Sequence, residues 1–256
     1  MHKIPDWLAN GLAVVTGAGS GLGRALAVEI CARGIRVAGL GRRVEALGET
    51  AQLAGPGFSA HICDVSNPHA VDETFAKLGP VALLINNAAV YPRRDFLEET
   101  GASFMDSIAT NLGGTVACSR AALNSMVETG QGRILNVATF ADLAPLPASS
   151  AYSVSKGAAR ILTRALVSDL GDRFPGIVIS DWMPGMLATR MGIADGLAPH
   201  VSARWGAELA LWHDPSLNGT TFEMDREILP PRGLKGKLKD LLLLRKTPRP
   251  RSIPGV

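Results

Sequence analysis

Cysteine is scarce in this sequence of 256 residues, which contains three, Cys31, Cys63 and Cys118. They are odd in number and far apart, and no CxxC pair occurs, so neither a disulfide framework nor a zinc site is expected. His200 and His213 also stand outside any metal-ligand pattern. We therefore expect no bound metal, and this use of cysteine is typical of a reducing compartment.

Long apolar runs are missing as well. The first residues, MHKIPDWLANGLAVVTG, lack the apolar stretch of a signal peptide, and no run approaches the roughly 20 residues that cross a bilayer. Hydrophobic residues nevertheless make up 46% of the chain and charged residues 19%, a composition that supports a sizeable core and argues against disorder. We expect a soluble, cytoplasmic protein, and the length suits one α/β domain.

The net charge of +3 is unevenly distributed. Residues 230–256 carry eight Lys or Arg and one acid, a net +7, which leaves −4 for the first 229 residues. Because the basic residues belong to the tail and not to the body, nucleic-acid binding by the main domain is not expected. We divide the chain into a domain over residues 1–229 and a basic tail over residues 230–256.

The tail has a helical pattern of its own. Four leucines follow the spacing i, i+4, i+7 and i+8 with lysines between them, which predicts a short basic amphipathic helix. These leucines are Leu234, Leu238, Leu241 and Leu242. We favour docking of this helix on the acidic body or on a neighbouring subunit, and contact with an anionic membrane surface is the alternative.

Short apolar or β-branched runs alternate with longer helical patterns along the body. The predicted strands are 12–16, 35–40, 58–63, 81–85, 133–137, 177–180 and 220–223. The predicted helices are 22–33, 44–53, 69–78, 102–128 and 152–173. This alternation predicts a single α/β domain with a doubly wound parallel sheet, a Rossmann-type three-layer sandwich. Ligands of such sheets bind beyond the carboxyl ends of the strands, where the unusual residues of this sequence stand.

A glycine-rich turn joins the first predicted strand to the first predicted helix. Glycines let the backbone turn tightly and approach a pyrophosphate, and the free amides of the helix start favour its negative charge. Such a turn alone is a weak signal, but its place at the start of a βαβ unit favours dinucleotide binding over a purely structural turn. The predicted phosphate-loop residues are Gly17, Ser20, Gly21, Leu22 and Gly23.

The end of the second predicted strand bears on the choice of cofactor. An acid there would hydrogen-bond the adenosine ribose and select NAD, but this sequence has Gly41 followed by Arg42 and Arg43. A guanidinium group suits a 2′-phosphate. The alternative is that both arginines only solvate the start of the next helix, although helix starts favour acids over bases. The sequence therefore predicts NADP(H), bound in part by Arg42 and Arg43.

Two further segments follow predicted strands and would close the nucleotide site. Asp64 and Val65 come after the third strand and would cap the adenine. Asn87 and Ala88 belong to a run of two asparagines and two alanines after the fourth strand, where small residues let a dinucleotide lie close. A surface Asn-Asn turn is the alternative for this run.

Tyr152 and Lys156 stand four residues apart at the start of a predicted helix, so they share one helical face. A phenol with a pKa of about 10 is a poor acid or base at neutral pH unless a nearby cation stabilises its phenolate. Lys156 can provide that charge. A YxxxK pair alone is common on helix surfaces, so its meaning depends on the other motifs.

These motifs together resemble the short-chain dehydrogenase/reductase family in their order and distances, over about residues 10–225. They are TGxxxGxG from Thr16, NNAA from Asn86, a mid-chain Asn111, a hydroxyl residue, YxxxK from Tyr152 and a later Pro-Gly. The resemblance implies a doubly wound domain, usually a homodimer or homotetramer. It also implies hydride transfer between a nicotinamide and a small-molecule carbonyl or alcohol.

The resemblance further implies roles for individual residues. Tyr152 would be the general acid in reduction and the base in oxidation. Lys156 would lower the tyrosine pKa and hold the nicotinamide ribose, and Asn111 would hold a water of the proton relay. The implied cofactor contacts are Gly17, Gly21 and Gly23 with the phosphates, Asp64 with the adenine, Asn87 beside the adenosine ribose, and Pro184, Gly185 and Thr189 with the nicotinamide amide.

The sequence departs from the family at three places. Thr139 stands thirteen positions before Tyr152, where the family usually has serine. Its hydroxyl can still donate to a substrate carbonyl, but its extra methyl restricts χ1 and crowds the site. Residues 191–204 are predicted to form a short substrate lid over an open or small pocket. The basic tail extends past the family's usual end.

The predicted function is an NADP-dependent carbonyl reductase or alcohol dehydrogenase, since the same residues serve both directions. The alternative is a dinucleotide-binding regulatory or scaffold protein with weak or no turnover, against which Tyr152, Lys156 and Asn111 together argue. A sugar-nucleotide epimerase or dehydratase shares YxxxK but needs a larger C-terminal substrate domain. Tyr91 is a candidate pocket wall. Arg93 or Arg94 could recognise an anionic substrate, although we favour surface solvation for both.

Overall fold

The computed structural model of the chain describes residues 4–229 and 249–255. Its strands form one sheet in the order β3-β2-β1-β4-β5-β6-β7-β8. All neighbouring strands are parallel except β7 and β8. The strands are β1 (Leu12–Thr16), β2 (Val37–Gly41), β3 (Phe58–Ile62), β4 (Val81–Asn86), β5 (Gly132–Val137), β6 (Ile177–Met183), β7 (Thr221–Glu223) and β8 (Arg226–Ile228).

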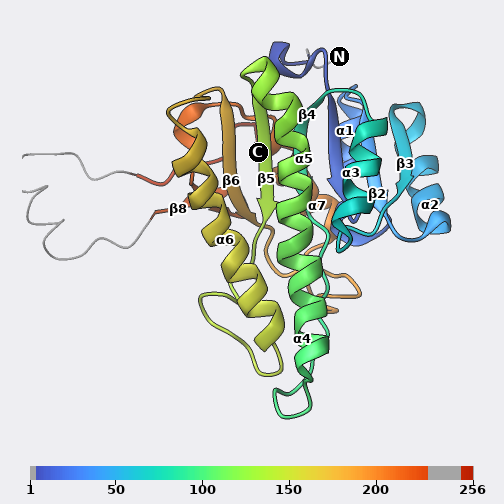
Figure 1. Cartoon of the computed structure of the whole chain (residues 1–256), viewed down its shortest axis with the longest axis vertical. Coiled ribbons are helices and arrows are strands. Elements are labelled where there is room, and N and C mark those ends of the chain that lie inside the picture. The colour runs from blue at the N-terminus through green and yellow to red at the C-terminus, as the bar shows by residue number, and fades with distance from the viewer. Residues whose placement is uncertain (1–3, 230–248, 256) are drawn as a thin grey trace, which may run out of the picture.

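Helices cover both faces of this sheet (Figure 1). They are α1 (Gly21–Ala32), α2 (Val44–Ala54), α3 (Pro68–Lys77), α4 (Gly101–Ile108), α5 (Gly114–Thr129), α6 (Ser150–Leu170) and α7 (Pro199–Leu211). The chain order reverses between β1 and β4, which lie side by side although β2 and β3 separate them in sequence. The predicted doubly wound α/β sandwich is confirmed, and ligands of such sheets bind at a switch point of this kind.

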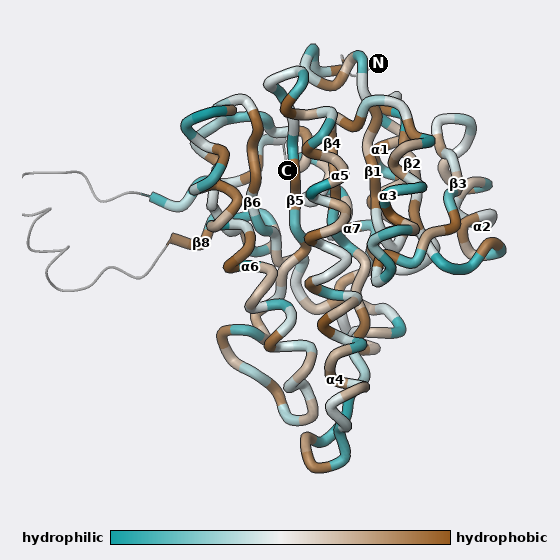
Figure 2. The backbone as a smooth tube through the Cα atoms, viewed as in Figure 1, coloured by the Kyte–Doolittle hydropathy of each residue, from teal (hydrophilic) through white to brown (hydrophobic). Residues whose placement is uncertain are grey.

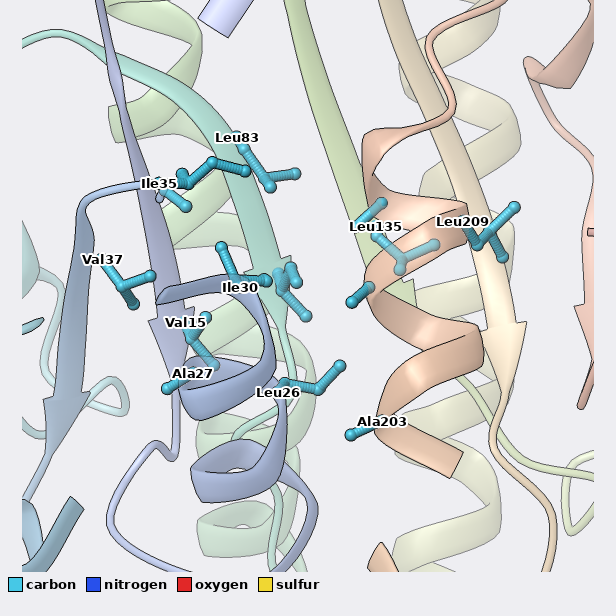
Figure 3. Close-up of a cluster of buried hydrophobic side chains, with 14 of the residues drawn as sticks. Val15, Leu26, Ala27, Ile30, Ile35, Val37, Leu83, Leu135, Ala203 and Leu209 are labelled. Carbon is cyan, nitrogen blue, oxygen red and sulfur yellow. The ribbon is translucent and has the colours of Figure 1, made fainter. Parts of the chain in front are cut away.

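Strand β1 explains why the sheet needs helices on both sides. Ala13 and Val15 lie in one buried cluster, with residues of α1 and α7. Leu12 and Val14 lie in the other, with residues of α5. Because side chains alternate between the two faces of a strand, a strand buried on both faces is apolar throughout. Figure 3 shows the first cluster, where Leu26 and Ile30 of α1 face the strands, and Figure 2 shows the hydrophobic colouring of β1 and β6.

Helix α7 corrects the prediction of a lid over residues 191–204. The helix begins at Pro199, so the second half of that segment is a packed helix and not a lid. Ala203 and Ala207 are fully buried. A Cβ on Gly206 would stand 2.6 Å from the indole of Trp182 and 2.8 Å from Leu26. These small residues let α7 pack closely on α1 and β6. The loop between β6 and α7 therefore ends at Pro199, before the predicted end of the lid.

Other differences are local. Strand β6 continues to Met183, three residues beyond its predicted end, and β8 was not predicted. The predicted helix 102–128 contains a π-helical turn, Ala109–Gly113, between α4 and α5. An extra residue in a helical turn disturbs the regular pattern and often marks a functional position.

The end of the chain returns to the body. Ser252 pairs with Arg226 of β8, and Ile253 is 3% exposed within the first core cluster. Arg251 donates to both carboxylate oxygens of Glu227, at 2.7 and 2.8 Å. The predicted amphipathic helix, with Leu234 to Leu242, lies outside the described residues, and the domain boundary at residue 229 stays a prediction.

Within the part of the chain that the structure describes, no helix has the length and apolar character that crossing a membrane requires. The same residues include no group of three or more His, Cys, Asp or Glu arranged to hold a metal ion.

Candidate active site

The glycine turn between β1 and α1 lies beside the segment that follows β4. Gly17 and Gly21 have φ angles of +68° and +52°, in the left-handed region that favours glycine. A Cβ on Gly23 would stand 2.2 Å from the carbonyl oxygen of Gly17 and 2.5 Å from Nδ2 of Asn87. The turn is therefore a cradle that side chains would fill, and such cradles fit a dinucleotide pyrophosphate.

Thr16, which was not among the predicted binding residues, fixes this cradle to the end of β4. Its Oγ1 accepts hydrogen bonds from the backbone N–H groups of Asn87 and Ala88, at 3.0 and 2.9 Å. The side-chain Nδ2 of Asn87 donates to the carbonyl oxygen of Thr16 at 2.8 Å. The structure thus brings the predicted residues of the glycine turn and of the NNAA segment together.

We expect Gly23→Ala to lower the free energy of unfolding by about 1–3 kcal/mol, because the added methyl overlaps the Gly17 carbonyl. The turn must shift to relieve this overlap, so affinity for the predicted dinucleotide should also fall. Urea unfolding and a fluorescence titration with NADPH measure the two effects. Gly48→Ala is the control, since a Cβ there meets nothing within 4 Å. Equal unfolding free energies for the two variants would contradict the steric argument.

The residues predicted to contact the adenosine half lie at the ends of β2 and β3. The Arg42 side chain is 63% exposed, and its Nη1 lies 3.9 Å from Oδ2 of Asp64. Oδ1 of Asp64 accepts hydrogen bonds from the backbone N–H and the hydroxyl of Ser66. Arg43 is exposed at the start of α2, and Val65 is buried. The structure brings Arg42 and Asp64 together at this edge.

Two of the remaining predicted cofactor residues lie at the start of α1. Ser20 is exposed at the N-cap, and its side chain makes no capping hydrogen bond. The Leu22 side chain is buried in the first core cluster, so only its backbone faces the turn. The free amides here are the groups that favour an anion.

The loop after β6 reaches back to the glycine turn. A Cβ on Gly21 would stand 3.3 Å from Cγ2 of Thr189, which places Thr189 against the phosphate side of the site. The carbonyl oxygen of Pro184 accepts a hydrogen bond from Ser202 of α7 at 2.8 Å, and Gly185 has a φ of +82°. Helix α7 therefore holds the start of the loop that continues to Thr189 beside the glycine turn.

Tyr152 lies in the first turn of α6, close to the side chain of Thr139. Burial is the main effect on the pKa of Tyr152 and raises it above the usual value for tyrosine. The nearby Tyr91 and Asp142 raise the pKa further, whereas hydrogen bonding with the Thr139 side chain lowers it. The net effect is a raised pKa, so the phenol stays protonated at neutral pH, as a proton donor requires.

Lys156 is 5% exposed, and its Nζ donates to the carbonyl oxygen of Val137 at 2.8 Å. Burial lowers the pKa of Lys156 to about 8, and the nearby Asp181 partly offsets that effect. The predicted lowering of the tyrosine pKa by this cation stays a prediction.

Asn111 lies in the π-helical turn and is fully buried. Its Oδ1 accepts from the backbone N–H of Val90 at 2.8 Å, and its Nδ2 donates to the Val90 carbonyl at 3.0 Å. Nδ2 also donates to the Ser155 hydroxyl at 2.9 Å. Ser155 stands between Tyr152 and Lys156, so Asn111 joins the segment after β4 to the helix that carries both. Its predicted role in holding a water stays a prediction.

Sequence reasoning missed Arg160, which is tied to the Thr139 loop. Its Nη2 donates to the carbonyl oxygen of Thr139 at 2.7 Å and to Oδ1 of Asp142 at 2.9 Å. The Arg160 and Asp142 side chains are 11% and 7% exposed. Arg160 follows Tyr152 and Lys156 at the same four-residue spacing, so helical periodicity could have placed it on the same face.

Asp181 was also missed, because an acid is unusual inside a buried strand. It is 2% exposed, and Oδ1 accepts from the Thr163 hydroxyl at 2.6 Å. Burial raises the pKa of Asp181 to about 7. Thr163 in turn accepts from Asn136, which accepts from Asn86 at 2.8 Å. These hydrogen bonds link β4, β5 and β6. The Asp181 carboxylate at the end of the series raises the pKa of Lys156.

Comparison with known proteins places this geometry in a family. The model of the short chain dehydrogenase family matches residues 11–197. Galactitol 2-dehydrogenase (L-tagatose-forming) from Cereibacter sphaeroides is 34% identical over 205 residues, which are 77% of this chain and 80% of that protein. Carbonyl reductase [NADPH] 2 from Sus scrofa is 34% identical over 181 residues, 70% of this chain and 73% of that protein.

A solved structure described as a short chain dehydrogenase/reductase family protein superimposes with a TM-score of 0.77 and 28% sequence identity, and covers 85% of this chain and 96% of that one. The family match spans the glycine cradle, the Tyr152 helix and the loop after β6 as far as Leu197. The chain therefore belongs to the short chain dehydrogenase/reductase family, whose members are oxidoreductases that transfer hydride between a nicotinamide dinucleotide and small-molecule alcohols or carbonyls.

Proposed function

We propose that this chain is an NADP(H)-dependent dehydrogenase/reductase in which Tyr152 is the general acid and base. One observation carries the proposal. The Tyr152 phenol lies close to the Thr139 side chain. Thr139 follows the end of β5 and Tyr152 lies in the first turn of α6, and because β5, β4 and β1 are parallel, the end of β5 lies at the same edge of the sheet as the glycine cradle after β1. A carbonyl held between two hydroxyl groups beside a dinucleotide site is a suitable reactant for hydride transfer.

A bound nicotinamide dinucleotide would supply the hydride in reduction and accept it in oxidation. Tyr152 donates its phenolic proton to the carbonyl oxygen as the substrate is reduced, and it takes the proton back in the reverse direction. Thr139 donates a hydrogen bond to the same oxygen. Lys156, with its pKa near 8, provides a positive charge that favours the phenolate once the proton has left.

The residues around this pair position it. Arg160 holds the backbone of Thr139, and Asn111 holds Ser155 within the same helical turn as Tyr152. We propose the glycines of the β1–α1 turn, with Ser20, Leu22, Asn87 and Ala88, as the binding site of the phosphates and the adenosine ribose. Pro184, Gly185 and Thr189 are proposed to hold the nicotinamide amide.

The preference for NADP(H) is proposed from Arg42. Its side chain is exposed just beyond the carboxyl end of β2. The last residue of that strand is Gly41, so the strand does not end in an acid that would bind the ribose. One relative carries the name carbonyl reductase [NADPH] 2, which agrees with this assignment. Asp64 neighbours Arg42, so an arriving phosphate would compete with a weak, exposed ion pair only.

We expect Arg42→Ala to weaken NADPH binding by about 1–3 kcal/mol and to leave NADH binding nearly unchanged, because only the former has a 2′-phosphate. Calorimetric titration of both cofactors measures the difference. Arg36→Ala is the matched control, since Arg36 is exposed just before the amino end of the same strand. Equal losses for the two cofactors in Arg42→Ala would overturn the assignment.

The decisive experiment for the activity is a screen of carbonyls with NADPH and of alcohols with NADP+. Ketoses and sugar alcohols belong in the panel, since the relatives include proteins named L-xylulose reductase and galactitol 2-dehydrogenase. Turnover that disappears in Tyr152→Phe supports the proposal. Binding of NADPH without turnover of any compound would favour the alternative of a dinucleotide-binding regulatory protein, which Thr139 motivates. Family membership also supports a homodimer or homotetramer, which sedimentation measures.

A further inference from the structure

The chain contains two tyrosines, and the structure stacks one on the other. The ring centroids of Tyr91 and Tyr152 are 4.5 Å apart, and the ring planes differ by 20°. Aromatic rings at this separation are in contact, so no substrate atom fits between them. Tyr91 comes from the segment after β4 and Tyr152 from α6, so residues distant in sequence form this pair.

Arg93 also contacts the Tyr91 ring. Its guanidinium carbon lies 5.3 Å from the centre of the Tyr91 ring, within the range of a cation–π contact. Its Nη2 also donates to the carbonyl oxygens of Met191 and Gly192, at 3.2 and 2.9 Å. Arg93 therefore holds the Tyr91 ring and ties it to the loop after β6, and it is not only a surface group as the sequence led us to favour.

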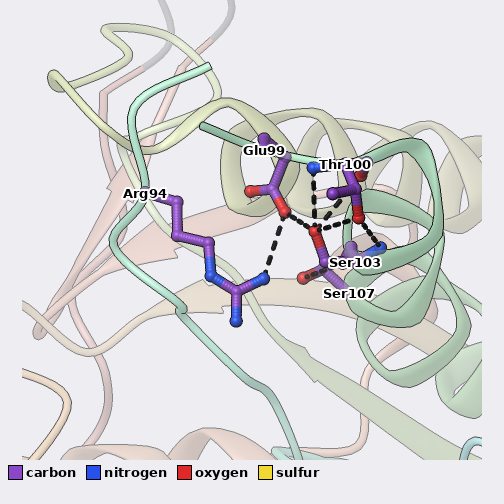
Figure 4. A network of polar contacts seen from close by, with 5 residues as sticks. All are labelled: Arg94, Glu99, Thr100, Ser103 and Ser107. Carbon is purple, nitrogen blue, oxygen red and sulfur yellow. Dashed lines mark hydrogen bonds and ion pairs between the residues drawn. The ribbon is translucent and has the colours of Figure 1, made fainter. Parts of the chain in front are cut away.

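Arg94 differs from its neighbour. Its Nη1 lies 3.4 Å from Oε1 of Glu99, and Glu99 accepts in turn from the Ser103 hydroxyl at the start of α4 (Figure 4). Thr100 and Ser103 form a capping box there, so Arg94 belongs to the support of this helix. Of the two arginines, only Arg93 has contacts that reach the Tyr152 ring through Tyr91.

We propose that Tyr91 is a specificity-determining residue of this site: its ring forms a fixed wall against one face of Tyr152, and Arg93 locks that wall to the loop of residues 191–192. The proposal rests on the proposed function of Tyr152. Because one face of the phenol is covered, a carbonyl must approach Tyr152 along its edge or its other face. The wall therefore favours slim carbonyl compounds and excludes those with a ring next to the carbonyl.

The loop that begins with Thr139 and the loop that Arg93 contacts both expose apolar side chains. Leu143, Leu146 and Met186 are 67%, 49% and 56% exposed on the loops before α6 and after β6. Ile193, beyond the residues that Arg93 holds, is 41% exposed. Apolar side chains left exposed beside a site are typical of contact with an apolar ligand. The expected substrates are small ketones or secondary alcohols with narrow alkyl groups.

The first test needs no turnover. Tyr91→Phe keeps the ring but leaves Tyr152 as the sole tyrosine, so tyrosinate absorbance reports its titration alone. Burial and its neighbours hold the pKa of Tyr152 above the usual value. We expect the midpoint to fall in Tyr91→Ala, where removal of the wall admits water. It should also fall when Arg93→Lys is added to Tyr91→Phe, because the positive charge remains but the planar guanidinium that holds the ring is lost.

Arg173→Lys in the Tyr91→Phe background is the matched control. Arg173 makes the same kind of contact, with its guanidinium carbon 5.6 Å from the centre of the Phe174 ring, beyond the far end of α6. The tyrosinate titration midpoint of this double variant should equal that of Tyr91→Phe alone. Identical midpoints in Tyr91→Phe and Tyr91→Ala would show that Tyr91 does not cover Tyr152, and the proposal would then fail.

The second test compares kcat/KM for butanone and acetophenone with NADPH. We expect Tyr91→Ala to shift the ratio toward acetophenone by about tenfold or more, as the loss of a few packed atoms typically does. Tyr91→Phe should keep the wild-type ratio, since the ring remains. An unchanged ratio in an active Tyr91→Ala enzyme overturns the specificity role. No turnover of any compound by the wild type overturns the proposed function instead, while the titration still tests the wall.

Discussion

Tyr152→Phe is expected to lower kcat by about a thousandfold or more and to leave NADPH affinity nearly unchanged. General acid–base groups contribute roughly 10²–10⁴ in rate, and Tyr152 is the proposed source of the proton in reduction. The substitution removes one hydroxyl and keeps the ring, so the stack with Tyr91 at 4.5 Å can persist. A change confined to the hydroxyl should affect the chemical step and not the dinucleotide cradle.

The measurement is the steady-state rate on any accepted substrate, together with an NADPH titration and a thermal unfolding curve. Val154→Ala is the control, because Val154 lies in the same helical turn and is 54% exposed. It should match the wild type in all three measurements. A Tyr152→Phe protein that retains more than about a tenth of the wild-type rate would exclude this phenol as the main proton donor.

The sequence predicts the parts of this molecule that depend on local physics. Strand β1 spans the predicted residues because an unbroken apolar run suits a strand buried on both faces. The glycine turn was predicted because positive φ angles and close backbone approach leave few alternatives to glycine. The Tyr152–Lys156 face follows from helical periodicity alone.

The missed elements depend on tertiary packing. Helix α7 has little apolar periodicity in large residues, since it packs through small ones such as Ala203, Gly206 and Ala207. These small residues are required because Trp182 and α1 pack against them, and that packing is a tertiary feature. Asp181 ended the predicted strand because polar residues usually leave the sheet, yet the Thr163 hydroxyl provides the hydrogen bond that a buried carboxylate requires.

The contacts around Tyr152 also depend on tertiary packing and could not be predicted from the sequence. The sequence identified Tyr91 as a candidate wall, but the stack with Tyr152 requires the path of the loop between β4 and α4. Arg93 was favoured as a surface residue because arginine usually is one. Its contacts with Met191 and Gly192 join two loops that lie about a hundred residues apart in sequence, and no local pattern specifies that pairing.

Thr139→Ala is expected to lower the rate by about a hundredfold or more, as the loss of one oriented donor at a reacting oxygen typically does. Oγ1 of Thr139 accepts from the backbone N–H of Ala141 at 3.2 Å, and this bond orients the hydroxyl while its proton remains available for donation. Arg160 holds the Thr139 carbonyl, so the backbone should keep its place in the variant. NADPH affinity should stay close to that of the wild type, because the hydroxyl faces Tyr152.

Thr139→Ser separates the hydroxyl from the methyl group. Serine keeps the donor and removes only the β-branch, so the variant should remain active and could accept bulkier ketones. If Thr139 only fills space in a protein that binds dinucleotide without turning over substrate, neither variant will differ from the wild type in activity. Rates for the three proteins on one substrate decide between these views. If Thr139→Ala keeps the wild-type rate, Thr139 has no role in the mechanism, and Tyr152 is the sole donor to the carbonyl.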